Sequence, residues 1–403
     1  MAKRILMVTE ALARGGAERQ MLALVSGLLD RGFQVQILEI IGVVPGQASF
    51  EEEFRALGVP PIRSLDIDRD PYDEGVACEI SASLEPHAAI LPASRESMVA
   101  GFCAAIRRFA PEVIHCWSDL ANILGGFTAI RLKVPRIVLG QRTFPPPYFL
   151  PPAAADGVLV AYRALIGHAK NAVMMTCSRQ GANAYQAWLA NGAPILVIYN
   201  GFLRSTIRFP AAAEIAQHRA DMAIPERAPV MGTVIRFDPA KDPELWLETA
   251  AQVADAMPDA HFILAGYGHD DAASRLRLRG DELGLGSRLH MPGAVRDVGW
   301  LYAMLDVLLL TSRTETTPNV LMEAQASGIP VVSSAVGGIS EVMLDGETGI
   351  LVHERSARVL AEAVLSILRE PLWRTNAMRR GPAFVAEKFG IDRMVEEIIA
   401  GYA

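Results

Sequence analysis

The chain has 403 residues, of which 51% are apolar and 21% are charged. This length exceeds one ordinary hydrophobic core and indicates two domains, and the apolar content excludes an intrinsically disordered chain. The formal charge of −7, with a pI near 5.7, argues against a general nucleic-acid-binding protein. Four cysteines lack CxxC spacing, which fits a reducing compartment better than a disulfide framework or a zinc site: Cys78, Cys103, Cys116 and Cys177.

The N-terminal stretch MAKRILMVTEALARGG superficially resembles a secretory signal peptide. Its apolar run stops after Val8 and is followed by Glu10 and Arg14, so a first β-strand explains it better. No window of the sequence approaches about 18 uninterrupted apolar residues, which predicts that no segment spans a membrane. We therefore expect a soluble or, at most, peripheral protein.

Short runs rich in β-branched residues alternate with longer amphipathic segments along the chain. The predicted strands of the first half are Arg4–Thr9, Gln34–Glu39, Val113–Trp117, Arg136–Gln141, Val173–Ser178 and Leu196–Tyr199. Those of the second half are Val230–Ile235, His261–Gly266, Leu289–Pro292, Val307–Ser312, Pro330–Ser333 and Gly349–Val352. Helical patterns fill most gaps, for example Ala17–Leu29, Pro243–Met257 and Ser356–Leu368. Because continuous apolar runs are typical of parallel strands, the two series of βα units predict an α/β protein with two doubly wound domains.

The boundary between the two series is predicted within residues 202–229, where the sequence RFPAAAEIAQHRADMAIPERAP reads as a connector. We therefore predict an N-terminal domain over residues 1–205, a linker over 206–228 and a C-terminal domain over 229–385.

Two segments of the first domain are predicted loops. Asp70–Pro92 lacks clean periodicity, and Phe144–Gly157 is rich in proline. Both are expected at the rim of the sheet, where ligands bind in such domains. For the first segment, a variable surface loop is an equally good interpretation.

The stretch TSRTETTPNVLMEAQASGIP contains a strand-to-helix turn. Asp306–Ser312 is a predicted strand, and the residues from Pro318 to Gly328 form a predicted helix, with proline in its first turn and glycine at its end. Thr316 or Thr317 is the expected N-cap.

Two glutamates flank the start of this helix. Glu315 is expected in the turn, and Glu323 is expected roughly 7–8 Å along the helix axis from its start, at about 1.5 Å per residue. The first helical turn between them offers unpaired N–H groups for a phosphate. The vicinal hydroxyls of a ribose could both donate to Glu323. A surface glutamate after a strand and a solvated glutamate on a helix are the alternative interpretation.

Two cations follow another predicted strand, in the sequence VIRFDPAKD. Arg236 ends the strand and Lys241 lies near the start of the next helix. Such a pair can bind a diphosphate and stabilise the charge that grows on it when it leaves. Alone, the pair could equally be ordinary surface charge.

Other motifs are weaker. Gly15 and Gly16 permit close approach of a ligand to the backbone, but a plain tight turn explains them as well, since GxGxxG is absent. HExxH, GxSxG and Walker A sequences are also absent. The Asp66–Asp68 pair has no supporting neighbours for a metal site. His115 is either a core histidine or a polar group that lines a ligand cleft.

Taken together, these motifs resemble the retaining glycosyltransferases of family 4. The resemblance rests on GGAERQ, YNG, RFDPAK, GYG, TETTPNVLMEAQASGIPVVSS and VGGISEVMLDGETGILV. It covers nearly the whole chain and is most specific over Arg236–Val352. Within it, Glu315 and Glu323 match the family's E-x7-E signature.

The resemblance implies a GT-B fold, with two Rossmann-like domains that face each other across a cleft. The N-terminal domain would bind the acceptor and the C-terminal domain the nucleotide-sugar. Residues 386–403, including a helix over Asp392–Tyr402, would pack back onto the N-terminal domain.

The resemblance also implies roles for residues. Arg236 and Lys241 would contact the diphosphate, Glu315 the transferred sugar and Glu323 the ribose, and the first three would be the catalytic residues. The full donor-binding set would be Gly16, Arg236, Lys241, Gly266, Tyr267, Val295, Arg296, Glu315, Thr317, Pro318, Asn319, Val320 and Glu323. The expected chemistry is front-face substitution with retention, in which the departing diphosphate takes the acceptor proton. Neither a metal nor another cofactor is expected, since the cations neutralise the diphosphate.

One departure from the family concerns its H-x-H pattern, whose second histidine reaches the donor sugar. Here HCW places His115 first and Trp117 second. The sugar contact is then made differently, or His115, Ser118 or Asp119 replaces it. The predicted acceptor-binding residues are His115, Trp117, Asp119 and Arg142.

The expected activity is transfer of a sugar, from a UDP-sugar or alternatively a GDP-sugar, to a glycan or lipid-linked glycan in cell-surface polysaccharide synthesis. The expected location is the cytoplasm, with a peripheral contact to the membrane through Phe144–Pro152, although burial against neighbouring loops explains that segment equally well. Two alternatives are a nucleotide-sugar epimerase of GT-B fold and an inactive nucleotide-sugar-binding subunit.

Overall fold

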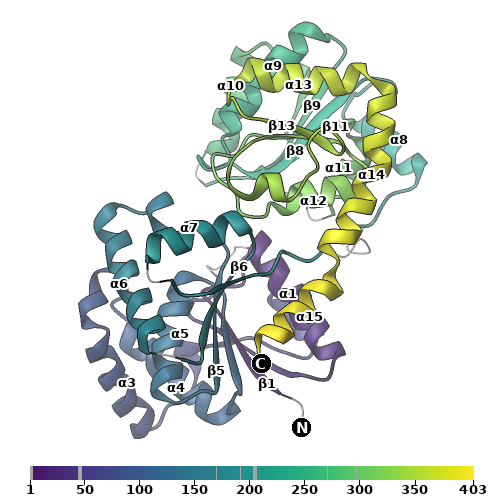
Figure 1. The fold of residues 1–403 in the computed structure, drawn as a ribbon. Helices are drawn as coiled ribbons and strands as arrows, with labels where there is room; N and C mark the ends of the chain where they lie inside the picture. Colours follow the sequence, from purple (N-terminus) through teal and green to yellow (C-terminus); the bar gives the residue numbers. More distant parts are fainter. Residues whose placement is uncertain are drawn as a thin grey trace. The chain divides into compact units, whose positions relative to one another are not determined.

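The computed structural model describes residues 3–43, 48–168, 170–190, 192–202, 207–269, 271–295 and 297–403. The chain divides into two compact units. Unit 1 comprises Met1–Gly201 together with Ile391–Ala403, and unit 2 comprises Phe202–Gly390. Each unit contains one parallel sheet with helices on both faces (Figure 1), so the predicted α/β class with two doubly wound domains is confirmed.

The sheet of unit 1 has seven strands in the order β3-β2-β1-β4-β5-β6-β7. Its strands are β1 (Arg4–Thr9), β2 (Gln34–Glu39), β3 (Ile62–Arg63), β4 (Val113–Cys116), β5 (Arg136–Gln141), β6 (Ala172–Thr176) and β7 (Ile195–Val197). The order reverses between β1 and β4, whose carboxyl ends therefore flank the crevice where ligands bind in such sheets.

The helices of unit 1 cover both faces of this sheet. They are α1 (Gly16–Asp30), α2 (Glu51–Ala56), α3 (Pro71–Ser83), α4 (Arg95–Phe109), α5 (Asp119–Arg131), α6 (Pro152–His168), α7 (Arg179–Leu189) and α15 (Ile391–Gly401). Successive residues of β1 alternate between two cores, as the period of a strand requires. Leu6 and Val8 pack on the side of α4 and α5, whereas Ile5 and Met7 pack on the side of α1 and α15.

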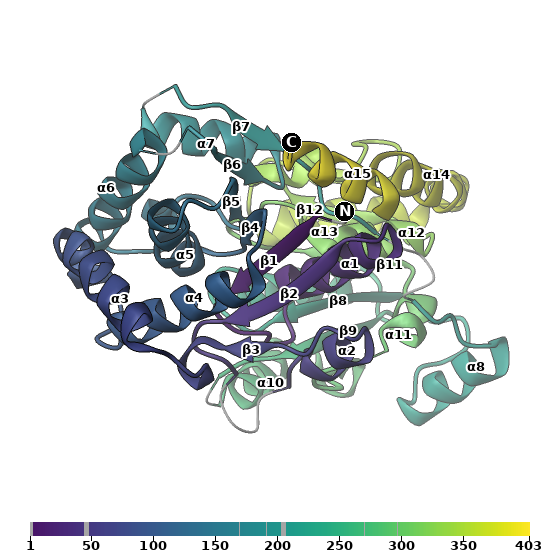
Figure 2. The same cartoon turned by 90° about the horizontal axis from the view of Figure 1, so that it is seen from below.

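Helix α15 lies beside α1 (Figures 1 and 2). Its approach is close at Gly27, where a Cβ atom would lie 2.6 Å from Cγ2 of Val395. Arg31 at the end of α1 also forms ion pairs with Asp392 at 3.0 Å and Glu396 at 2.7 Å. The final residues of the chain are thus an integral part of unit 1.

The sheet of unit 2 has six strands in the order β10-β9-β8-β11-β12-β13. Its strands are β8 (Val230–Arg236), β9 (His261–Tyr267), β10 (Leu289–His290), β11 (Val307–Leu310), β12 (Val331–Ser334) and β13 (Gly349–Val352). Its helices are α8 (Ala212–Asp221), α9 (Pro243–Ala256), α10 (Ala272–Glu282), α11 (Gly299–Met304), α12 (Asn319–Ala326), α13 (Ala357–Arg369) and α14 (Pro371–Phe389). Helices α9 and α13 pack against each other, as do α12 and α14 (Figure 1). The strand order reverses between β8 and β11.

Two predicted loops are largely helical, so those predictions were wrong. Asp70–Pro92 contains α3 and a 3₁₀ segment, Glu85–Ile90. Asp70 caps α3 reciprocally with Asp73, and Pro71 is its first residue. The buried residues of α3 share one face at helical spacing, but two of them, Asp73 and Ser81, are polar, so the apolar pattern is weak. In the proline-rich segment, a 3₁₀ turn over Pro146–Tyr148 is followed by α6.

The predicted linker over residues 206–228 contains a helix of unit 2. Helix α8 packs against α11, and the rings of His218 and Trp300 stack with centroids 4.7 Å apart. The unit boundary itself lies between Gly201 and Phe202.

Candidate functional site

The carboxyl ends of three neighbouring strands of unit 2 gather the predicted donor residues. Arg236 is the last residue of β8 and pairs in register with Tyr267, the last residue of β9. Lys241 lies in the turn between β8 and α9, and Glu315 follows β11. Since β8 and β11 flank the strand-order reversal, this edge is where a doubly wound sheet binds ligands.

Lys241 and Glu315 form an ion pair in this structure. The Lys241 Nζ lies 2.6 Å from Oε1 of Glu315, and the two side chains are 22% and 9% exposed. Ser312 Oγ donates to the same carboxylate oxygen at 2.7 Å. The structure thus brings together two of the three residues that the sequence predicted to be catalytic. Ser312 was not predicted.

Arg236, the third predicted catalytic residue, is 61% exposed and pairs with Asp238 at 3.0 Å. Asp238 also accepts hydrogen bonds from the backbone N–H groups of Ala240 and Lys241. The turn from Arg236 to Lys241, here called the cationic turn, therefore also contains the carboxylate of Asp238, for which the sequence suggested no role.

Helix α12 begins at Asn319, with Pro318 at the N-cap position and no side-chain cap hydrogen bond there. The prediction that Thr316 or Thr317 is the N-cap was therefore wrong. Since a proline N-cap offers no side-chain acceptor, the first-turn N–H groups are not capped by that residue. Thr317 is buried, whereas Asn319 and Val320 are half-buried at this end of the helix.

Glu323 lies in α12 and is only 6% exposed. The buried hydroxyl of Tyr302, from α11, donates to its Oε2 at 2.7 Å. A solvated glutamate on an exposed helix face is therefore excluded. A buried carboxylate needs such a donor, because desolvation without hydrogen bonds is costly.

Gly266 and Tyr267 end β9 beside this edge. Gly266 has a φ of +141° and donates its N–H to the Gly293 carbonyl at 2.8 Å, which brings the loop after β10 alongside. Tyr267 is 41% exposed. Val295 lies half-buried in the same loop. The predicted donor residue Arg296 lies outside the residues that the structure describes.

In unit 1, Gly16 is the first residue of α1, and Gly15 is its extended N-cap residue. The side chain of Glu18, in the first turn, folds over Gly15. A negative charge thus lies beside the loop that was predicted to approach phosphates. The role of Gly16 stays a prediction.

His115 is fully buried in β4, and its Nδ1 lies 2.8 Å from the Tyr402 hydroxyl. Burial, with a smaller contribution from the charge of Arg142, lowers the pKa of the His115 imidazole to about 3. These contacts favour the interpretation of a core histidine, since no part of the ring is accessible to an acceptor in this structure.

Trp117 is 1% exposed, and its Nε1 donates to the Ala17 carbonyl at 2.9 Å. Arg142 lies over its ring, with Cζ 4.3 Å from the centroid, and also hydrogen-bonds Asn200. Trp117 therefore packs under α1 and supports Arg142. Only Arg142 of these two predicted acceptor residues offers accessible surface at the carboxyl edge.

Asp119 begins α5, after β4, and belongs to a polar network. Tyr162 donates its hydroxyl to Asp119 Oδ1 at 2.7 Å and accepts from Gln141 Nε2 at 2.7 Å. Tyr185 donates to the Gln141 amide at 2.8 Å. Burial, opposed by the hydrogen bond from Tyr162 and aided by the neighbouring Glu10 carboxylate, raises the pKa of Asp119 to about 6. The network partners of Asp119 were not predicted, because strand order decides which side chains meet.

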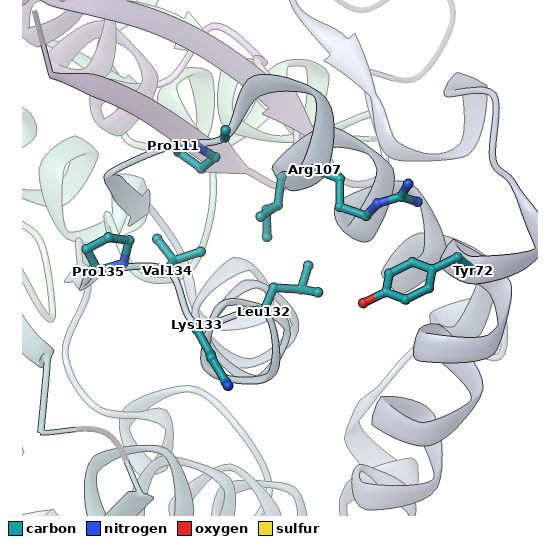
Figure 3. Close-up of a pocket in the computed structure, with 9 residues that line it drawn as sticks. Tyr72, Arg107, Pro111, Leu132, Lys133, Val134 and Pro135 are labelled. Carbon is teal, nitrogen blue, oxygen red and sulfur yellow. The ribbon is translucent and has the colours of Figure 1, made fainter. Parts of the chain in front are cut away.

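A cavity of about 430 Å³ lies elsewhere in unit 1 (Figure 3). Its lining includes Pro111, Lys133 and Pro135, which precede β4 and β5 and so mark the amino edge of the sheet. Tyr72 and Arg107 complete its rim. The cavity therefore lies at the edge opposite the predicted acceptor residues.

The exposed aromatic side chains of the proline-rich segment are Tyr148 at 59% and Phe149 at 52%. Phe144 is buried, with its ring centroid 4.9 Å from that of Tyr148. Burial against neighbouring loops thus explains Phe144 but neither of the exposed rings. Among the described residues, no helix combines the length and apolar character needed to cross a membrane.

Comparison with known proteins identifies both units. Residues 15–201 match the family described as a glycosyl transferase 4-like domain, and residues 214–383 match glycosyl transferases group 1. The chain belongs to the GT-B glycosyltransferases. HepE from Anabaena, solved with UDP-glucose, has the same fold as this glycosyltransferase, with a TM-score of 0.76, 19% identity and 98% of each chain covered. A glycosyltransferase from Rickettsia africae gives a TM-score of 0.79 at 15% identity, over 100% of this chain and 98% of that one.

Among sequence relatives, a Vi polysaccharide biosynthesis protein of Salmonella typhi, VipC/TviE, is 29% identical over 300 residues. The match covers 70% of this glycosyltransferase but only 49% of the relative. The chain therefore spans about half the length of that relative, which has further sequence outside the match.

Proposed function

We propose that this glycosyltransferase moves a sugar from a nucleoside-diphosphate sugar to a glycan acceptor with retention of anomeric configuration. The observation that carries the proposal is the ion pair of Lys241 with Glu315 beside Arg236 at the carboxyl edge of unit 2. This arrangement offers two cations for a diphosphate and one carboxylate for the sugar attached to it. Glu323, held by Tyr302, supplies a second carboxylate for a ribose.

In the proposed reaction, the diphosphate replaces Glu315 as the partner of Lys241. The released carboxylate of Glu315 then accepts hydrogen bonds from sugar hydroxyls. Arg236 and Lys241 stabilise the charge that grows on the β-phosphate as its bond to the anomeric carbon breaks. The acceptor oxygen bonds to the same face of that carbon, and its proton passes to the departing diphosphate. The two cations take the place that a divalent metal has in other glycosyltransferases.

For the acceptor, we propose a surface glycan or its lipid-linked precursor, with unit 1 as its binding domain. The support is the likeness to a Vi polysaccharide biosynthesis protein. Arg142 and Asp119 are the candidate contacts, since each follows a strand at the carboxyl edge. A UDP-sugar is the proposed donor because a protein of the same fold was solved with UDP-glucose.

A thermal-shift screen with UDP-, GDP-, ADP- and CMP-sugars tests the donor. With the best donor, Glu323→Ala should weaken nucleotide binding, whereas Lys241→Ala should mainly lower kcat, about a hundredfold, because it stabilises the leaving group. Product NMR should show an α-glycoside from an α-linked donor. Wild-type kinetics in Lys241→Ala would remove the central support of the mechanism.

Two results would replace the proposal. Isomerisation of the UDP-sugar without an acceptor would establish an epimerase. Nucleotide binding with neither transfer nor slow donor hydrolysis would establish an inactive binding subunit.

We further propose that Tyr148 and Phe149 contact the cytoplasmic membrane face when the acceptor is lipid-linked. Aromatic rings at loop tips are suited to the membrane interface. Tyr148→Ser with Phe149→Ser should reduce co-sedimentation with anionic vesicles. Tyr72→Ser, which removes an equally exposed ring at the opposite sheet edge, is the matched control. Equal binding of the two variants would exclude this membrane contact.

A further inference from the structure

Asp238 contacts both members of the cationic turn. Its Oδ2 lies 3.0 Å from Nη2 of Arg236, and its Oδ1 accepts from the backbone N–H groups of Ala240 at 3.0 Å and Lys241 at 3.2 Å. The Asp238 carbonyl also accepts from the Lys241 N–H at 3.0 Å. One residue thus fixes the Arg236 side chain and the Lys241 backbone.

The other side of the turn is held by the segment after β11. Thr311 Oγ1 donates to the Lys241 carbonyl at 3.2 Å, and the Arg313 N–H donates to the Ala240 carbonyl at 2.7 Å. These contacts from the segment after β11 restrain the backbone carbonyls of residues 240 and 241, while Asp238 restrains the backbone N–H groups of the same two residues. The Lys241 side chain then projects from a fixed base to Glu315.

A carboxylate at this place has an electrostatic cost. Asp238 pairs with one of the two cations that we propose to bind a diphosphate, so its charge opposes that of the ligand. A short polar side chain that only closes the turn would not need the charge, because a neutral amide oxygen accepts the same backbone hydrogen bonds. The ion pair with Arg236 is the contact that uses it.

We propose that Asp238 positions the two cations, Arg236 and Lys241, that bind the diphosphate. It orients Lys241 through the turn and Arg236 through the ion pair. This inference rests on the proposed function, because Asp238 acts only through the two cations. Its two carboxylate oxygens have separable tasks. Oδ1 orients Lys241 for the transition state, and Oδ2 restrains Arg236 until the diphosphate arrives.

The test compares Asp238→Asn with Asp238→Ala in the full chain. Asparagine keeps Oδ1 for the two backbone N–H groups but removes the charge that pairs with Arg236. We expect kcat within about threefold of the wild type and UDP binding tightened about threefold, since the repulsion is removed. Alanine removes both contacts, and kcat should fall about tenfold or more because Lys241 is misplaced.

Asp345→Ala is the matched control. Asp345 is an exposed loop residue before β13 whose Oδ1 accepts from the Leu351 N–H at 2.8 Å. It tests whether loss of any side-chain-to-backbone bond in unit 2 lowers turnover. If Asp238→Ala does not fold, Asp238→Ser, whose hydroxyl can partly close the turn, takes its place in the comparison.

The inference is supported if Asp238→Asn keeps a kcat near the wild-type value and binds UDP more tightly, while Asp345→Ala has the wild-type kcat. Asp238→Ala within twofold of wild-type kcat overturns it, as does Asp238→Asn that is as slow as Asp238→Ala. If Asp345→Ala is equally slow, the effect is general and the inference is also overturned. Failure of the wild type itself to bind or turn over any of the screened UDP-, GDP-, ADP- and CMP-sugars overturns the proposed function, and with it this role.

Discussion

Replacement of Gly266 by alanine should selectively destabilise the carboxyl edge of the unit 2 sheet. Gly266 has a φ of +141°, which lies in a region of backbone conformation that only glycine adopts without strain. A Cβ atom there would overlap the Ile235 carbonyl oxygen and would lie 2.9 Å from the Ile235 carbonyl carbon and 3.3 Å from Cε1 of Phe237. The obstacle is backbone of the neighbouring strand β8, which cannot rotate away as a side chain could.

The expected loss of unfolding free energy follows from three contributions. The strained φ costs about 1–3 kcal/mol. Relief of the overlap requires a backbone shift and costs about 1–3 kcal/mol, as in overpacked cores. That shift also threatens the hydrogen bond from Gly266 to Gly293, which contributes about 1 kcal/mol. We therefore expect a total loss of about 3–7 kcal/mol for Gly266→Ala.

Gly284→Ala is the control, because Gly284 has a φ of +75° and nothing within 4 Å of the added Cβ. It should lose only the conformational contribution, about 1–2 kcal/mol. Hydrogen exchange in urea can report each unit separately, since a chain with two units need not unfold in one step. Peptides from β8 and β9 should lose protection in Gly266→Ala, while peptides from β1 keep it. Equal losses in the two variants would refute the crowding argument.

Three further predictions concern the described side chains. Tyr302→Phe should lower the unfolding free energy of unit 2 by about 2 kcal/mol and weaken UDP binding, measured by urea titration and calorimetry, because the buried Glu323 loses a donor; unchanged UDP affinity would contradict this. A double-mutant cycle of Lys241→Met and Glu315→Gln should give a coupling of about 1 kcal/mol without ligand, and less with UDP bound, if the diphosphate takes over the lysine; equal coupling in both states would exclude the exchange. The pKa of Asp119 rises from 3.8 to about 6 on folding, so stability is lost as pH rises through this window and is constant above it. Relative to Asp119→Asn, wild-type stability should fall by up to about 3 kcal/mol between about pH 4 and 6, at about 1.4 kcal/mol per pKa unit; parallel stability curves would show that this carboxyl is not perturbed.

Much of the fold could be predicted because parallel strands buried on both faces leave continuous apolar runs. The predicted bounds of Arg4–Thr9 and Gln34–Glu39 agree with β1 and β2. The edge strand Ile62–Arg63 was missed, since two exposed residues carry no such pattern. Helix α3 was missed because two of the five residues on its buried face, Asp73 and Ser81, are polar, so the apolar pattern is weak, although its capping residues signalled its start.

The candidate site was predictable residue by residue but not contact by contact. Each cation and carboxylate follows a predicted strand, so its place at a sheet edge was inferable. Which of these strands lie next to each other depends on the strand order of the sheet, which the sequence does not display. The pairing of Lys241 with Glu315, across the adjacent strands β8 and β11, therefore needed the structure. Tyr302 and Ser312 were missed because neither lies in a recognisable motif, and their contacts with Glu323 and Glu315 likewise needed the structure.

The return of α15 to unit 1 has a consequence for synthesis of the chain. Unit 2 is one continuous segment, whereas unit 1 needs residues from both sides of it. A growing chain therefore exposes the face of α1 that receives α15 until translation has passed through unit 2. Met394, Val395, Ile398 and Tyr402 all enter that core, and the Tyr402 hydroxyl also forms a hydrogen bond with Nδ1 of the buried His115. The earliest-made unit is thus the last that can be completed, and its exposed apolar face is the part of the nascent chain that most needs protection from aggregation.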